Sequence, residues 1–99
     1  MILSFADDET SNIYHGIKSA RARKRLDPIL WSIAQRKLDM INKAQKIEDL
    51  RVPPNNHLEK LKADLEGCYS IRINNKWRII FQWNQNQSGV SQVKIVDHH

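Results

Sequence analysis

The chain ends in three residues that can exchange protons or bind a metal: Asp97, His98 and His99. Histidine titrates near neutral pH, and an adjacent carboxylate can orient its ring. A divalent metal with His57 as a fourth ligand is one use for such a set. Successive residues of a strand point to opposite faces, so neighbours cannot all reach one ion, and we expect no metal. Acid–base chemistry remains; a frayed tail, a purification-tag remnant or ordinary solvated polar residues are the alternatives.

Two arginines lie in a predicted hairpin and supply positive charge. The stretch CYSIRINNKWRIIFQW contains two runs of alternating apolar residues that meet at a polar turn, which predicts paired antiparallel strands. A two-residue turn would put the two apolar sets on opposite faces. A three-residue loop over 74–76 keeps one face apolar, with Ile71 opposite Ile79. In that register Arg72 and Arg78 lie directly opposite each other on the second face.

Opposed like charges destabilise a strand pair by a few tenths of a kcal/mol, up to about 1 kcal/mol. An anion such as a phosphate would relieve the repulsion between Arg72 and Arg78, because two guanidinium groups bind it well. Two other arrangements remain open. Both side chains can extend into water, or they can pair with a carboxylate such as Glu66.

The densest positive segment lies nearer the N-terminus and meets no acid until Asp27; it comprises Lys18, Arg21, Arg23, Lys24 and Arg25. The whole chain has 16 Lys and Arg against 11 Asp and Glu, and its pI is near 9.6. Such a balance favours an anionic partner, for example RNA, DNA or an acidic protein surface. The basic segment is therefore a candidate phosphate contact, and a solvated helix face is the alternative.

The elements that must position these groups fit one domain spanning residues 1–99, which is long enough to bury a single core. Residues 1–5 predict a short strand, and residues 6–25 a helix or irregular helical segment. Asp27 followed by Pro28 predicts the start of the firmest helix, which runs to about residue 47, before two prolines. A loop that can hold one helical turn then leads to the hairpin, and residues 90–96 predict a last strand, with Val93 and Ile95 on one face and Lys94 and Val96 on the other.

Several classes of protein are disfavoured by what the sequence lacks. Cys68 is the only cysteine, so we expect a reducing compartment and no intrachain disulfide. The N-terminal MILSFADDE has neither the basic start nor the long apolar core of a signal peptide, and no segment reaches transmembrane length. We therefore expect a cytoplasmic protein that does not bind a membrane. No glycine-rich phosphate loop or nucleophile elbow is visible.

Acid–base cleavage of RNA matches the groups that remain. The reaction needs a base for the 2′-OH, an acid for the leaving 5′ oxygen and cations for the charge on phosphorus. Histidine and arginine supply all three, so we expect no cofactor.

Three stretches, in colinear order from about residue 1 to the C-terminus, then resemble the plasmid-maintenance killer proteins of the HigB type in the RelE superfamily of bacterial toxins: RKLDMINKAQKIEDLRVPPNNHLEKL, GCYSIRINNKWRIIFQW and VKIVDHH. The most specific parts are SIRINNKWRIIF and the terminal V-x-I-V-D-x-H. The resemblance implies an α+β fold with two N-terminal helices packed on a small twisted, mainly antiparallel sheet. It also implies a toxin that cleaves mRNA in the ribosomal A site. The implied partners are the ribosome, mRNA and a HigA-type helix-turn-helix antitoxin, which neutralises the toxin and through which alone operator DNA is contacted.

Carried over by position, the family's terminal Asp-Tyr-His falls on Asp97, His98 and His99, and its strand arginine after Trp falls on Arg78. His98 thus replaces a tyrosine, which could stack on a base as well as donate a proton. The resemblance implies that His99, oriented by Asp97, and His98 transfer protons while Arg78 steadies the scissile phosphate.

A histidine that some family members place in the loop before the hairpin falls on Glu59, and His57 lies two residues earlier. Either residue, or neither, completes the set. Lys62 and Arg72 are expected to help place the RNA, and Arg21, Arg23, Lys24 and Arg25 to hold ribosomal RNA. Two rival functions stay open: a non-catalytic RNA-binding module, and a protein-interaction partner without nuclease activity, for which the altered terminus is the best sequence argument.

Overall fold

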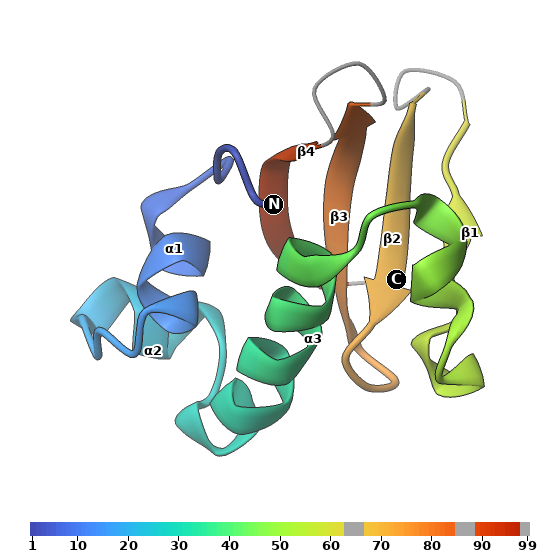
Figure 1. The fold of residues 1–99 in the computed structure, drawn as a ribbon. Helices are drawn as coiled ribbons and strands as arrows, with labels where there is room; N and C mark the ends of the chain where they lie inside the picture. Colours follow the sequence, from blue (N-terminus) through green and yellow to red (C-terminus); the bar gives the residue numbers. More distant parts are fainter. Residues whose placement is uncertain (63–66, 85–88, 98–99) are drawn as a thin grey trace.

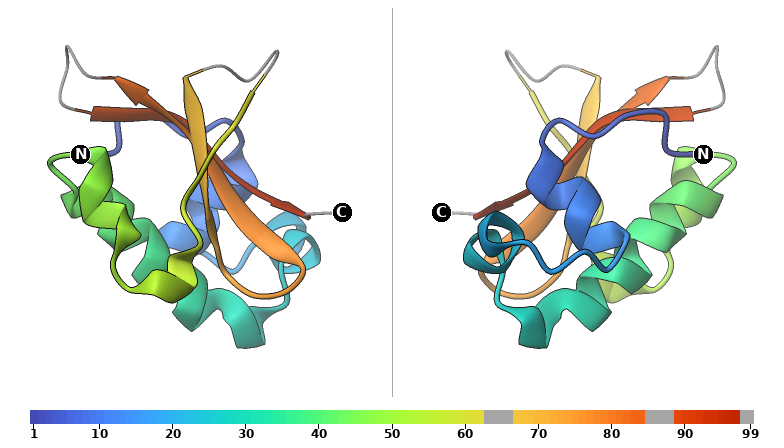
Figure 2. Two further views of the ribbon diagram at one scale, coloured as in Figure 1. Left: turned by 90° about the vertical axis from the view of Figure 1, so that its right-hand side faces the viewer. Right: turned by 90° about the vertical axis from the view of Figure 1, so that its left-hand side faces the viewer.

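A computed structural model describes residues 1–62, 67–84 and 89–97 of the chain. Its three α-helices are α1 (Asp8–Tyr14), α2 (Ala20–Arg25) and α3 (Trp31–Lys43), and three short 3-10 helices are η1 (Pro28–Leu30), η2 (Ile47–Arg51) and η3 (Pro54–Asn56). The antiparallel sheet has the order β1 (Glu59–Lys60), β2 (Cys68–Arg72), β3 (Trp77–Asn84) and β4 (Gly89–Asp97). The helices pack against one face of the sheet, and the sheet is strongly twisted (Figures 1 and 2). The expected α+β fold is confirmed.

The β2–β3 hairpin has the register that the apolar pattern predicts. Ile71 pairs with Ile79, and Arg72 pairs with Arg78. The N–H of Ile73 donates to the carbonyl oxygen of Trp77 at 2.9 Å, which closes the three-residue loop. The predicted hairpin is therefore confirmed residue by residue.

The predicted helical segment over residues 6–25 is two helices rather than one. Asp7 caps α1 by accepting the N–H of Thr10 at 2.8 Å, and α1 ends before Gly16, whose φ of 73° is the left-handed conformation that glycine adopts at low cost. Ser19 then caps α2 by accepting the N–H of Ala22 at 3.2 Å. The fold thus contains one more α-helix than the two that the resemblance implies.

The predicted helix over residues 28–47 begins and ends differently. Asp27 accepts the N–H of Ile29 at 3.0 Å, but this cap opens the 3-10 turn η1 before α3 begins. The helix α3 ends at Lys43, and the N–H of its C-cap Ala44 still donates to the carbonyl oxygen of Met40 at 3.0 Å. The carboxylate of Asp49 accepts the two N–H groups that follow, of Gln45 at 3.0 Å and Lys46 at 3.3 Å. Those groups therefore do not donate to helix carbonyls.

The first five residues form two isolated parallel bridges to β4, Ile2 with Val90 and Phe5 with Val93, in place of the predicted strand. The register of β3 and β4 shifts by one residue at Gln92, which has a φ of 56°. This bulge lets Val90 and Val93, three positions apart, both face the core.

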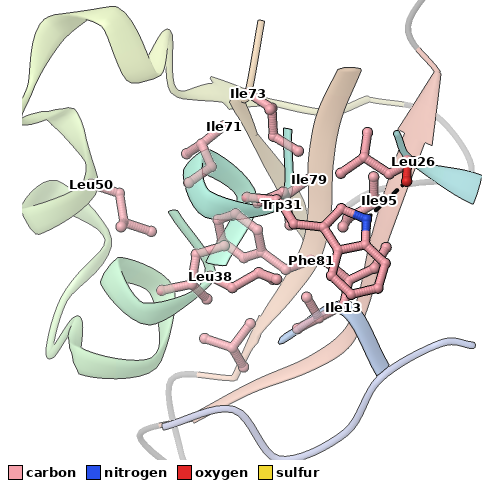
Figure 3. Packing of buried hydrophobic residues seen from close by; sticks show 14 of the residues in the cluster. Ile13, Leu26, Trp31, Leu38, Leu50, Ile71, Ile73, Ile79, Phe81 and Ile95 are labelled. Carbon is pink, nitrogen blue, oxygen red and sulfur yellow. Dashed lines mark hydrogen bonds between the residues drawn. The ribbon is translucent and has the colours of Figure 1, made fainter. Parts of the chain in front are cut away.

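The core lies between the helices and the sheet (Figure 3). Its largest fully buried side chain is Phe81 of β3, and the indole N–H of Trp31 donates to the Leu26 carbonyl oxygen at 2.8 Å. The opposite face of the sheet carries Arg72 and Arg78. Among the described residues, no helix combines the length and apolar character needed to cross a membrane.

Candidate functional site

Arg78 is a buried cation on the second face of β3. Its residue is only 6% exposed, and its Nε donates to the Ser70 hydroxyl at 2.9 Å. Its Nη2 donates to the backbone carbonyl oxygens of His57 at 2.6 Å and Ser70 at 3.3 Å. Burial lowers the pKa of Arg78; the carboxylate of Glu59, 3.9 Å from Nη1, opposes that shift and the guanidinium of Arg72 adds to it. The guanidinium is thus fixed in one orientation.

A pocket of about 200 Å³ opens beside this guanidinium; it is lined by His57, Arg72, Asn74, Asn75 and Arg78. Arg72 Nη1 lies 3.4 Å from the Nε2 of His57, and Arg72 Nη2 donates to the side-chain oxygen of Asn75. Two guanidinium groups and one imidazole therefore surround the same space. Such a set can bind a phosphate and exchange a proton beside it.

His57 reaches the pocket because the chain before it is anchored in the core. Asn56 is fully buried and donates to the carbonyl oxygens of Leu50 at 3.2 Å and Val52 at 3.4 Å. His57 follows in the left-handed conformation, with a φ of 47°, and ends η3. Its backbone carbonyl binds Arg78, so the same residue contributes both the ring that lines the pocket and an acceptor that holds the arginine.

Glu59 and Lys62 follow His57 in the chain, in and just after β1. Glu59 is in β1 opposite Ser70, where its carboxylate neighbours Arg78 but does not line this pocket. Lys62 is exposed and lies two residues beyond the end of β1. Of Glu59 and His57, the two candidates for the position of the family's loop histidine, only His57 lines the pocket.

Asp97 is the last residue of β4 and pairs with Trp77, the residue before Arg78. Its carboxylate lies 3.8 Å from Lys76 Nζ. Because side chains alternate along a strand, Asp97 falls on the opposite face from Arg78. His98 and His99 lie outside the described residues.

The basic segment divides into two kinds of residue. Arg21, Arg23 and Lys24 are exposed on α2. Arg25 is half-buried and donates to Asp7 at 2.7 Å, to Glu9 at 3.2 Å and to the backbone carbonyl oxygen of Ile95 at 3.1 Å. Arg23 and Lys24 lie open to an anionic partner, and Arg21 is exposed with its Nη2 3.6 Å from the Glu9 carboxylate. Arg25 instead joins α1 and α2 to β4.

Three contributors to the site were not among the predicted residues: Ser70, Asn74 and Asn75. A signal existed for Ser70, because it alternates onto the same face as Arg72 in the predicted strand. Asn74 and Asn75 were treated only as turn residues. Asn74 does serve the turn, since its side-chain oxygen accepts the N–H of Trp77 at 2.8 Å.

The part of the chain that the structure describes contains no group of three or more His, Cys, Asp or Glu side chains arranged to hold a metal ion. The set of Asp97, His98 and His99 falls partly outside that part. His57 instead faces Arg72, and a nearby cation disfavours a metal at that ring.

Comparison with known proteins gives concordant results. Residues 3–99 match a family model described as the RelE-like toxin of the type II toxin–antitoxin system HigB. The chain is 38% identical over 100 residues to Toxin HigB-1 of Vibrio cholerae, covering all of this chain and 98% of that protein. It is 36% identical over 83 residues to a protein of Haemophilus influenzae, covering 84% of this chain and 79% of that one.

Two solved structures share the fold. Both are YoeB–YefM complexes from Staphylococcus aureus, one of them described as a heterotetrameric toxin–antitoxin complex. The TM-scores are 0.63 and 0.62, at 16% and 17% identity, and each alignment covers the whole of this chain and at least 98% of the other. At that identity the likeness concerns the fold alone.

Proposed function

This chain belongs to the HigB family of RelE-like toxins of type II toxin–antitoxin systems, and from that premise we propose that it is a ribosome-dependent endoribonuclease that cleaves mRNA in the ribosomal A site. The observation that carries the proposal is the pocket beside Arg78, where two guanidinium groups and the His57 ring meet; we call it the catalytic pocket. Cleavage at that pocket stops translation.

The reaction is a transfer within the RNA strand. A base removes the proton of a 2′-OH, the resulting oxygen attacks the adjacent phosphorus, and an acid protonates the 5′ oxygen that leaves. Negative charge builds on the phosphate oxygens, and fixed cations stabilise it without having to reorganise. Arg78 suits this role because three oxygen acceptors already hold its guanidinium in place.

Proton transfer is assigned to histidine. His99, oriented by Asp97, and His98 serve as the terminal acid–base groups. Because Asp97 falls on the sheet face opposite Arg78, this assignment requires the terminal groups to act around the end of β4, whereas His57 lines the wall of the pocket. Glu59 acts on the charge of Arg78 rather than on the RNA, since its carboxylate lies 3.9 Å from Nη1 and does not line the pocket. No step in this scheme needs a metal or a cofactor.

The wider surface places the toxin on its substrate. Arg72 and Lys62 contact the mRNA, and the exposed cations Arg21, Arg23 and Lys24 bind ribosomal RNA. Arg25 contributes through the fold, because its donors are occupied by Asp7, Glu9 and Ile95.

The same family assignment supplies the partner. We propose that a HigA-type helix-turn-helix antitoxin binds this chain in the cytoplasm, neutralises it and connects it to operator DNA. The matching family is described as the toxin of a type II toxin–antitoxin system, which supports an antitoxin partner.

The deciding experiment is cleavage of a defined mRNA by purified protein, with and without programmed ribosomes, followed by mapping of the new ends. Wild type is expected to cut only on ribosomes, and His99→Ala to lose the cuts while keeping its thermal unfolding transition. Cuts retained in the variant would remove His99 from the mechanism. If wild type protects the RNA stoichiometrically without cutting it, the protein is an RNA-binding module instead.

A further inference from the structure

A second cavity, of about 310 Å³, lies between α3 and the tip of the hairpin; we call it the helix-side cavity, and it is lined by Ile33, Arg36, Lys37, Asn55, Arg72, Ile73 and Asn74. Three of these residues are cationic and none is acidic. Two isoleucines add apolar surface. Cationic side chains can bind a phosphate, and apolar surface beside them can contact the attached ribose or base.

The lysine of this cavity is held in place without a carboxylate. Lys37 is 5% exposed, and its Nζ donates to the side-chain oxygen of Asn56 and, at 3.5 Å, to that of Asn55. Burial lowers the pKa of Lys37, and the neighbouring charge of Arg36 lowers it further. Within the described ranges neither cation forms an ion pair, so two unneutralised charges lie beside an open space.

The helix-side cavity adjoins the catalytic pocket, with which it shares two lining residues. Arg72 and Asn74 line both spaces. Arg72 also carries the contact to His57 at 3.4 Å, so its side chain marks the boundary between them. The two spaces therefore meet at Arg72, with His57 and Arg78 on one side of it and Arg36 and Lys37 on the other.

We propose that the helix-side cavity is a second RNA subsite, in which Arg36 and Lys37 bind the phosphate of a nucleotide adjacent to the one that is cleaved. This inference rests on the proposed function for its choice of RNA as the ligand. A bound phosphate would also neutralise positive charge in the cavity, because the described lining of the cavity contains no acidic residue.

The test measures binding of non-cleavable 2′-O-methyl oligoribonucleotides to the full chain without ribosomes. A dinucleotide occupies only the catalytic pocket, whereas a hexanucleotide extends into the second cavity. Wild type should bind the hexanucleotide more tightly by about fivefold to tenfold, the effect of one or two charged contacts. Arg36→Gln, an exposed substitution, should abolish that gain, and the salt slope of log K for the hexanucleotide should fall by about 0.7.

Lys43→Gln is the matched control, because it removes the same charge from the same helix outside the cavity, where Lys43 pairs with Asp39 at 2.9 Å. It should retain most of the gain. Lys37→Met, checked first for a normal unfolding transition, should behave like Arg36→Gln.

Equal affinity of the two oligonucleotides for wild type, no binding of either, or equal losses in Arg36→Gln and Lys43→Gln would overturn the second subsite. The proposed function fails separately. If the gain depends on Arg36 but wild type does not cut mRNA on ribosomes, the subsite holds and the nuclease assignment is wrong.

Discussion

Arg72 on β2 and Arg78 on β3 are direct cross-strand partners, yet their guanidinium groups bind different neighbours. Arg78 binds Ser70 and the backbone of His57, whereas Arg72 binds Asn75 and approaches the His57 ring. The oxygen acceptors that hold the two guanidinium groups are uncharged, so they fix the positions of the two positive charges and do not neutralise them. Among the described residues only Glu59 lies within ion-pair distance of either group, so the pocket keeps a net positive charge for an anion.

Arg78→Lys should reduce ribosome-dependent cleavage by about 10²-fold or more, because one ammonium group cannot reproduce the fixed fork that holds the phosphate. The variant keeps the positive charge, so the loss would measure geometry rather than charge. The measurement is single-turnover cleavage on programmed ribosomes, with urea unfolding as a control on folding. Cleavage within a few fold of wild type would remove Arg78 from the stabilisation of the transition state.

His57→Asn should lower the cleavage rate by about 10²-fold to 10⁴-fold if the ring takes part in proton transfer. Asparagine tolerates the left-handed backbone found at His57, so the fold should remain intact. Glu59→Gln is the comparison, and it should change the rate much less because Glu59 does not line the catalytic pocket. A larger loss in Glu59→Gln than in His57→Asn would reverse the assignment.

Ser70 is a positioning residue, since its hydroxyl accepts from Arg78 Nε at 2.9 Å within a buried site. Ser70→Ala leaves that donor without its acceptor, which should lower the free energy of unfolding by about 1 to 3 kcal/mol. Cleavage should fall through kcat, while KM for programmed ribosomes changes little. Ser70→Thr keeps the hydroxyl on a residue suited to strands and should restore kcat. A stability loss with unchanged kcat in Ser70→Ala would make the role purely structural.

The local pattern of the sequence was sufficient for the hairpin. Period-two alternation on both sides of a polar turn leaves one loop length that keeps the apolar face continuous, and that register places Arg72 opposite Arg78. The direction of each guanidinium was not predictable, because Arg78 binds the carbonyl oxygen of His57 from a segment 21 residues away in the chain.

Contacts between distant segments account for the other differences. The bulge at Gln92 is held by the hydroxyl of Ser4, which accepts its N–H at 3.0 Å from the other end of the chain. Arg25 looked like one more exposed base within a charged run. Its partners Asp7 and Glu9 precede it by more than four turns of a helix, and its partner Ile95 is in the last strand. These contacts could not be predicted from the spacing of neighbouring charges along a helix. The roles of His98 and His99 stay predictions.

The contacts of Arg25 predict how stability depends on pH. Burial would raise the pKa of Asp7, but hydrogen bonds from Thr10 and Arg25 outweigh it and hold that pKa below its ordinary value of 3.8. A carboxyl group whose pKa is lowered in the folded state stabilises the fold above that ordinary value, and the contribution is lost as the pH falls through the folded pKa. Wild type should therefore lose stability as the pH drops below about 4.

In Arg25→Gln the free energy of unfolding near neutral pH should be lower than in wild type, and its decrease toward acidic pH should be shallower. Urea unfolding between neutral and acidic pH measures both. Arg23→Gln, which removes the same charge from an exposed position, should leave both unchanged within about 0.5 kcal/mol. Arg25 also donates to the carbonyl oxygen of Ile95, two residues before Asp97, so Arg25→Gln should slow cleavage as well. If Arg25→Gln and Arg23→Gln gave the same dependence of stability on pH, the contacts of Arg25 would not hold β4 in place.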